Sequence, residues 1–111
     1  MQTEANPYQA RQGEVYLRAT PEVPTGAKPV KRSGAIVLSR GSTTQHSHRI
    51  EAKTAKLLTL GTGPTERRFL VLQRAARLDC ERHAAITLPS GTYEVTIQRQ
   101  QQLGRTSNSA D

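Results

Sequence analysis

Aromatic side chains are scarce in this sequence, which has no tryptophan, one phenylalanine and three tyrosines among 111 residues. Proteins that bind single-stranded nucleic acid by base stacking present several aromatic rings along one groove. The few rings here are scattered along the chain, so the sequence argues against such a stacking platform. The hydrophobic fraction is 34%, and the core must therefore be built mainly from Val, Ile, Leu and Ala.

The chain has a single cysteine, Cys80, which excludes an intramolecular disulfide and fits a reducing compartment. Because Cys80 alternates with apolar residues, we expect its thiol to pack in the core. No apolar run approaches the roughly 20 residues that a membrane helix needs. The first residues also lack the basic-then-apolar pattern of a secretory signal. We therefore expect a cytoplasmic protein that makes no membrane contact.

Positive charge is in excess, with 16 Lys and Arg against 9 Asp and Glu and a net charge of +7. An excess of this kind favours polyanionic partners, so RNA or DNA is a candidate partner through the basic surface. No block of five like charges occurs, and the alternative is that the arginines only solvate the surface.

Glycine and proline divide the chain into short segments. Residues 1–12 and 100–111 are polar and without periodicity, which is typical of a flexible N-terminal arm and a flexible C-terminal tail. The domain is expected at residues 13–99. Segments of strand length within it cover 14–19, 35–38, 45–52, 56–60, 68–73, 76–80, 83–88 and 92–99.

These segments predict an all-β fold, a small single-domain barrel or sandwich with little or no helix. A helix near 51–60 or 74–82 is the alternative for those two stretches. The clearest alternation follows residue 92, where Tyr93, Val95 and Ile97 share the face expected to be buried. The preceding Pro89-Ser90-Gly91 predicts a tight turn between paired strands.

Three histidines are the candidate functional residues. His46 and His48 are two positions apart, so both imidazoles would project from one face of a strand. His83 begins another strand, and the three together could bind zinc, iron or nickel while leaving a position for water. The possible oxygen ligands are Glu51, Glu81 and Glu94. The alternative is that the histidines lie on a solvated face.

The same histidines support acid–base catalysis without a metal. His46, His48 and His83 titrate near neutrality, so one could act as base and another as acid on a phosphodiester. A nearby arginine would hold the phosphate or the developing charge. The candidates for that role are Arg49, Arg82 and Arg99.

Two glycine- and histidine-containing motifs resemble those of the cupins, small β-barrels that hold a metal with histidines and a glutamate. The residues at positions of the first motif are Gly41, His46, His48 and Glu51, with both gaps one residue short. Those at positions of the second are Pro89, Gly91, Glu94 and Gln98. Glu94 stands where a cupin has its ligand histidine and Gln98 where it has an asparagine, so the resemblance implies both as ligand-binding positions.

The chain also resembles a set of small, uncharacterised bacterial and phage proteins. The shared segments are Gly13-Glu14-Val15, His46-Ser47-His48 and the stretch from Glu81 to Arg99, with Gln45 replacing a glycine. This resemblance implies that the histidines matter but brings no activity with it. Our main hypothesis is a β-barrel protein that binds a metal or small polar ligand through a histidine cluster. The alternatives are a basic nucleic-acid-binding module, in one form a metal-independent ribonuclease, and a non-catalytic phage or accessory interaction protein.

Overall fold

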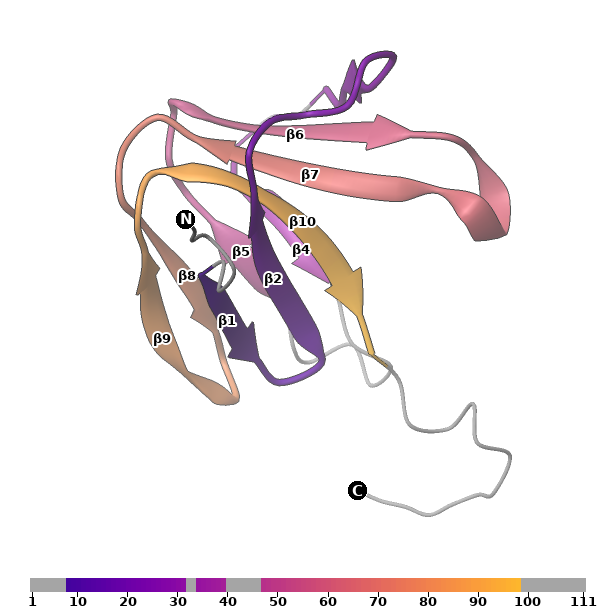
Figure 1. Ribbon diagram of the computed structural model, residues 1–111. Helices are drawn as coiled ribbons and strands as arrows, with labels where there is room; N and C mark the ends of the chain where they lie inside the picture. The colour runs from indigo at the N-terminus through magenta and orange to yellow at the C-terminus, as the bar shows by residue number, and fades with distance from the viewer. Residues whose placement is uncertain (1–7, 32–33, 40–46, 99–111) are drawn as a thin grey trace, which may run out of the picture.

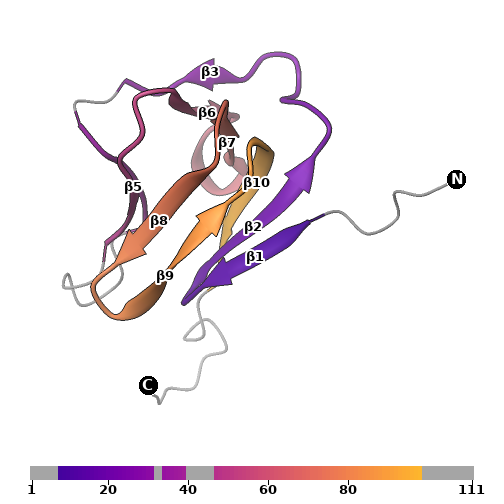
Figure 2. The same ribbon diagram turned by 90° about the vertical axis from the view of Figure 1, so that its left-hand side faces the viewer.

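The computed structural model describes residues 8–31, 34–39 and 47–98. Two antiparallel sheets pack against each other in this part of the chain (Figures 1 and 2). The all-β prediction is confirmed, and the hydrogen bonding of the described strands leaves two sheets and closes no barrel. The described residues include no α-helix, only a short 3-10 turn at Gly63–Thr65. Accordingly, no helix found there is long and apolar enough to cross a membrane.

The larger sheet has six strands in the order β1-β2-β10-β7-β6-β3. Their bounds are Gln9–Gln12, Val15–Thr20, Gly91–Ile97, Arg67–Leu72, Ala55–Leu60 and Lys28–Pro29. The smaller sheet has four strands in the order β4-β5-β8-β9. Their bounds are Ile36–Ser39, His48–Ile50, Ala76–Cys80 and His83–Leu88.

The core lies between the sheets and follows the two-residue alternation of each strand. Tyr93 and Val95 are buried as predicted, and Ile97 packs at the margin of the core. From the smaller sheet, Ile50 and Leu78 are fully buried against them. Aliphatic side chains dominate this core, in agreement with the scarcity of aromatic residues.

Residues 55–60 and 76–80 form β6 and β8, which confirms the strand prediction over the alternative of a helix. Two expectations about local structure need correction. Gln9–Gln12, expected in the arm, forms β1 and pairs with β2. The turn at Pro89-Ser90-Gly91 connects β9 in the small sheet to β10 in the large sheet, so it does not join paired strands.

The candidate site lies at one end of the sandwich, where two turns meet the start of β5. The turns are those between β1 and β2 and between β8 and β9, at the lower end in Figure 2. Contacts between β1 and β9 bring the edges of the two sheets together there. Side chains from both sheets therefore meet at this end.

Candidate metal site

Three side chains with metal-binding atoms converge at this end: His48 from β5, Cys80 from the end of β8 and His83 from the start of β9. One ligand atom of each lies within 4.8 Å of the others. His48 and His83 stack with ring centroids 5.7 Å apart. The expectation that His83 lies near a histidine of the 46–48 segment is therefore met by His48.

His48 is buried because of its place in the alternation of β5. His48 and Ile50 face the core, whereas Arg49 between them faces outward. Only 2% of His48 is exposed to solvent. A histidine enclosed in this way needs partners for its ring nitrogens, since an unpaired buried polar group is costly.

Gln12, at the end of β1, supplies that partner from the other sheet. Its Nε2 donates to the carbonyl oxygens of Leu78 and Ala84, each at 3.0 Å. These two bonds fix the amide orientation, because the reversed amide would set its oxygen against two carbonyl oxygens. Gln12 Oε1 is thus the acceptor for His48 Nδ1, at 2.7 Å. The proton of the neutral imidazole is held on Nδ1, and Nε2 carries the lone pair.

Cys80 lies on the Nε2 side of the ring, with its Sγ 3.8 Å from His48 Nε2. The expectation of a thiol packed in the core is wrong: Cys80 is half-buried and lies beside two imidazoles. Cys80 and His83 are paired across the β8–β9 ladder and flank its two-residue turn. A Cys-x-x-His sequence on such a turn was the available signal, and our sequence interpretation missed it.

A glycine allows the β1–β2 turn to approach His83. Gly13 has φ +58°, in the left-handed region that favours glycine. A Cβ built on Gly13 would lie 2.6 Å from His83 Nε2 and 3.2 Å from His48 Cε1. The turn therefore covers the edges of both rings, and any side chain at position 13 would displace the more exposed one, His83.

Glu81 connects the β8–β9 turn to the start of β5. Its carboxylate accepts the backbone N–H of Ser47 at 2.9 Å and the Arg49 guanidinium at 2.8 Å. Together with a bond from its own backbone, these donors lower the pKa of Glu81 to about 2. Both carboxylate oxygens are engaged in these contacts. Glu81 therefore connects the turn that follows Cys80 to the residues on either side of His48, and it is not a metal ligand.

The other predicted residues lie in different places. Glu94 points from the outer face of the large sheet and forms an ion pair with Arg67, with an Nε–Oε2 distance of 2.9 Å. Glu51 is exposed near Arg49, and Gln98 is exposed with its backbone N–H donating to the backbone carbonyl of Glu14. Neither Glu51 nor Glu94 belongs to the group of metal-binding atoms formed by His48, Cys80 and His83.

Two predicted residues, His46 and Arg99, lie outside the described residues. The pair of imidazoles expected from His46 and His48 therefore stays a prediction. Arg82 is exposed in the turn between Cys80 and His83, next to the cluster. Of the sequence-predicted residues that are described, the structure brings together His48 and His83, and Arg82 is the sequence neighbour of His83.

Comparison with known protein families gives a match to a domain of unknown function over residues 11–98. The chain belongs to the DUF8820 family. The matched range begins inside β1 and ends just after β10, so all the site residues of this DUF8820 domain lie within it. No curated protein and no solved structure matches the chain.

Proposed function

We propose that this DUF8820 domain binds one divalent transition-metal ion, zinc in the first place, through His48, Cys80 and His83. The observation that carries the proposal is the convergence of the three donor atoms within 4.8 Å. Gln12 adds to it, because metal-ligating histidines characteristically donate their second ring N–H to a fixed acceptor. That bond directs His48 Nε2 toward the thiol.

The distances suit a single ion. Nitrogen and sulfur bound to one tetrahedral zinc, at about 2.0–2.1 Å and about 2.3 Å, lie roughly 3.6 Å apart. The separation between His48 Nε2 and Cys80 Sγ is 3.8 Å. His83 is the exposed member of the group, so its ring can rotate to close the remaining separation.

The donor set favours zinc and other borderline metals, including iron and nickel, over magnesium or calcium, which prefer oxygen ligands. Three protein ligands leave a fourth position of a tetrahedral ion for water or a ligand, the pattern of catalytic zinc sites. Because His48 is buried and His83 is exposed, we expect that position to be on the His83 side of the group.

The test is metal binding by the purified protein. We expect one equivalent of zinc by equilibrium dialysis, and a thiolate-to-metal charge-transfer band when cobalt replaces zinc. His83→Gln and Cys80→Ser should each weaken binding by more than about 100-fold, since losing only an outer partner of a ligand costs roughly 10–100-fold. Thr87→Gln, exposed on the same strand as His83, is the control. Wild-type affinity in both ligand variants would reject the site.

The same contacts also fit a second function, in which Cys80 acts as a nucleophile. Gln12, His48 and Cys80 are arranged as orienting group, base and nucleophile, with separations of 2.7 Å and 3.8 Å. In this function His48 Nε2 takes the thiol proton and the Cys80 thiolate attacks an electrophilic carbon. Iodoacetamide, which loses iodide in that step, distinguishes the two functions. Protection of Cys80 by stoichiometric zinc supports the metal site, and unchanged alkylation with zinc supports the nucleophile.

Nucleic-acid binding stays a prediction. The ribonuclease mechanism has less support than the metal site, because His48 is only 2% exposed and a phosphodiester would have to reach it. A chelator-resistant ribonuclease activity that is lost in His83→Ala would favour it.

A further inference from the structure

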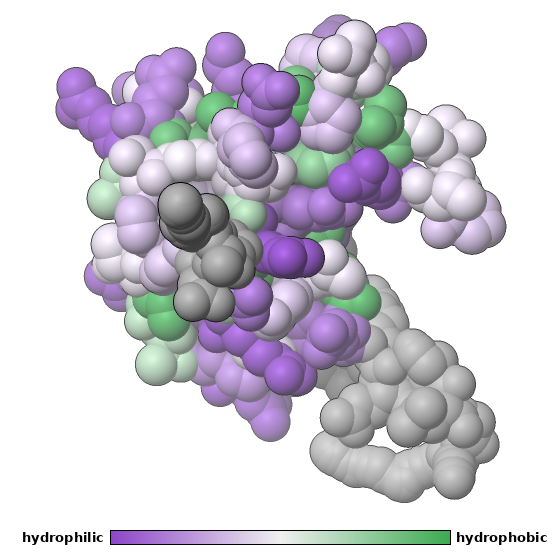
Figure 3. Space-filling model, in the orientation of Figure 1, coloured by the Kyte–Doolittle hydropathy of each residue, from purple (hydrophilic) through white to green (hydrophobic). Residues whose placement is uncertain are grey.

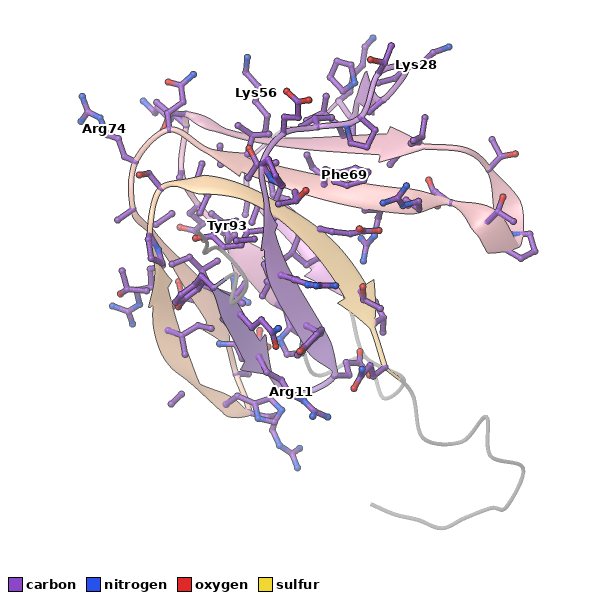
Figure 4. The ribbon with its side chains drawn as sticks, in the orientation of Figure 1. Arg11, Lys28, Lys56, Phe69, Arg74 and Tyr93 are labelled. Atoms are coloured by element: carbon purple, nitrogen blue, oxygen red, sulfur yellow. The ribbon has the colours of Figure 1, made fainter. Side chains whose placement is uncertain are left out.

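Two exposed arginines belong to the two turns that meet at the candidate metal site or are bonded to them. Arg82 occupies the turn between Cys80 and His83. Arg11 is exposed on β1, and its Nε donates to the carbonyl oxygen of Gly13 at 3.0 Å. Because Gly13 lies against the His83 ring, this hydrogen bond fixes the Arg11 guanidinium to the residue that covers that imidazole. Figure 4 shows Arg11 at the end of β1 that carries the site.

These two arginines differ from three others whose charge is balanced by a carboxylate. Arg49 pairs with Glu81, Arg67 with Glu94, and Arg77 with Asp79, at N–O distances of 2.8, 2.9 and 2.8 Å. In the part of the chain that the structure describes, neither Arg11 nor Arg82 forms an ion pair.

The surrounding surface is polar. The face over the β1–β2 turn is hydrophilic in Figure 3. Two guanidinium groups beside a metal with an accessible position would provide hydrogen-bond donors and positive charge for one anion, and charge-assisted hydrogen bonds from arginine to oxyanions are strong and often bidentate. Arg11 and Arg82 therefore place two positive charges without an ion-pair partner, among the described residues, beside one site.

We infer that the accessible metal position takes the phosphate or carboxylate group of a small molecule, with Arg11 and Arg82 donating to its oxygens. This inference rests on the proposed metal function. The metal binds one oxygen, and the guanidinium groups bind those that remain. A localised pair of cations suits a single anionic group better than the repeated phosphates of a polynucleotide.

The experiment uses the cobalt-loaded full-length protein titrated with inorganic phosphate and, separately, with acetate. We expect at least one of the two anions to change the visible cobalt spectrum saturably. Arg82→Gln and Arg11→Gln should each weaken the binding of that anion by about tenfold or more, because a hydrogen bond to a charged group is lost. Arg11→Lys keeps the positive charge but loses the planar guanidinium, which can donate two parallel hydrogen bonds. This variant tests whether such bidentate binding matters. Arg74→Gln, an exposed arginine far from Arg11 in Figure 4, should bind like wild type.

The outcomes separate this inference from the metal site. Failure to bind cobalt overturns both. Cobalt binding without any anion effect, or with an effect equal in all arginine variants, overturns the inference and leaves the metal site intact. A single-stranded oligonucleotide distinguishes the sources of phosphate. Binding much tighter than that of inorganic phosphate would overturn the small-molecule assignment in favour of nucleic acid.

Discussion

Replacing Gln12 should affect both stability and metal binding, because its buried side-chain amide joins the two sheets and orients the proposed ligand His48. Only 3% of Gln12 is exposed, and its side chain makes three hydrogen bonds. Gln12→Leu keeps a similar side-chain size and removes all three. The carbonyl of Leu78 and the Nδ1–H of His48 then each lose this hydrogen bond in buried surroundings, whereas the partly exposed carbonyl of Ala84 can bind water.

Each buried group left unpaired costs about 1–3 kcal/mol. Two such groups, offset in part by the burial of a leucine side chain, give a destabilisation of roughly 2–4 kcal/mol. This is a large share of the 5–15 kcal/mol that is usual for a domain. Chemical denaturation in the presence of a chelator measures the effect without a metal contribution. Gln73→Leu, at an exposed glutamine, should stay within about 0.5 kcal/mol of wild type.

Gln12→Leu should also bind zinc about 10–100-fold more weakly than wild type, because His48 loses the acceptor that orients it. Gln12→Glu separates this effect from stability. It keeps an acceptor for His48 but sets an oxygen against the carbonyls of Leu78 and Ala84, so stability should fall while zinc affinity largely returns. Wild-type stability in Gln12→Leu would refute the assigned hydrogen bonds. Equal zinc affinities in Gln12→Leu and wild type would refute the orienting role.

Two further predictions concern the turn at the site and an ion pair away from it. Gly13→Ala and Gly63→Ala, at φ +58° and +61°, should share a backbone cost of about 1–2 kcal/mol in denaturation. Only Gly13→Ala should also weaken zinc binding, since nothing lies within 4 Å of a Cβ on Gly63; equal zinc affinities would contradict this. The Arg67 hydrogen bond lowers the pKa of Glu94, so the pair stabilises the fold above the unfolded value near 4.5 and loses this contribution as the pH falls through the lower folded value. Glu94→Gln should therefore cost up to about 1 kcal/mol at neutral pH and progressively less in acid, and a cost that does not vary with pH would exclude this linkage.

The strands were predictable because alternation is a local property of the sequence. The buried positions of β10, Tyr93 and Val95, follow directly from it. Which strands pair is decided by tertiary structure. For that reason the Pro89–Gly91 turn was located correctly, but its two strands were assigned to one sheet.

The site was only half predictable for a related reason. The histidines attracted attention by residue type, whereas Cys80 has the same alternation with apolar residues as a packing thiol. Gln12 carries no sequence signal of burial, since glutamine is mostly exposed in proteins. Its role depends on the approach of β1 to β8 and β9. Contacts between sheets of this kind have no local pattern.

The division of the site between the sheets has a consequence for folding. All three proposed ligands belong to the small sheet, whereas Gln12 and Gly13, which orient and cover them, belong to the β1–β2 hairpin of the large sheet. A metal that requires oriented ligands therefore binds only after the sheets have docked, and its binding free energy adds to that of docking. At 100 times its dissociation constant, such a ligand contributes about 2.7 kcal/mol. For a core with so few aromatic residues, this is comparable to the whole contribution of Gln12. Because zinc affinity should fall about 10–100-fold in Gln12→Leu, the variant should lose its own hydrogen bonds and, at that zinc concentration, about half or more of the metal's contribution.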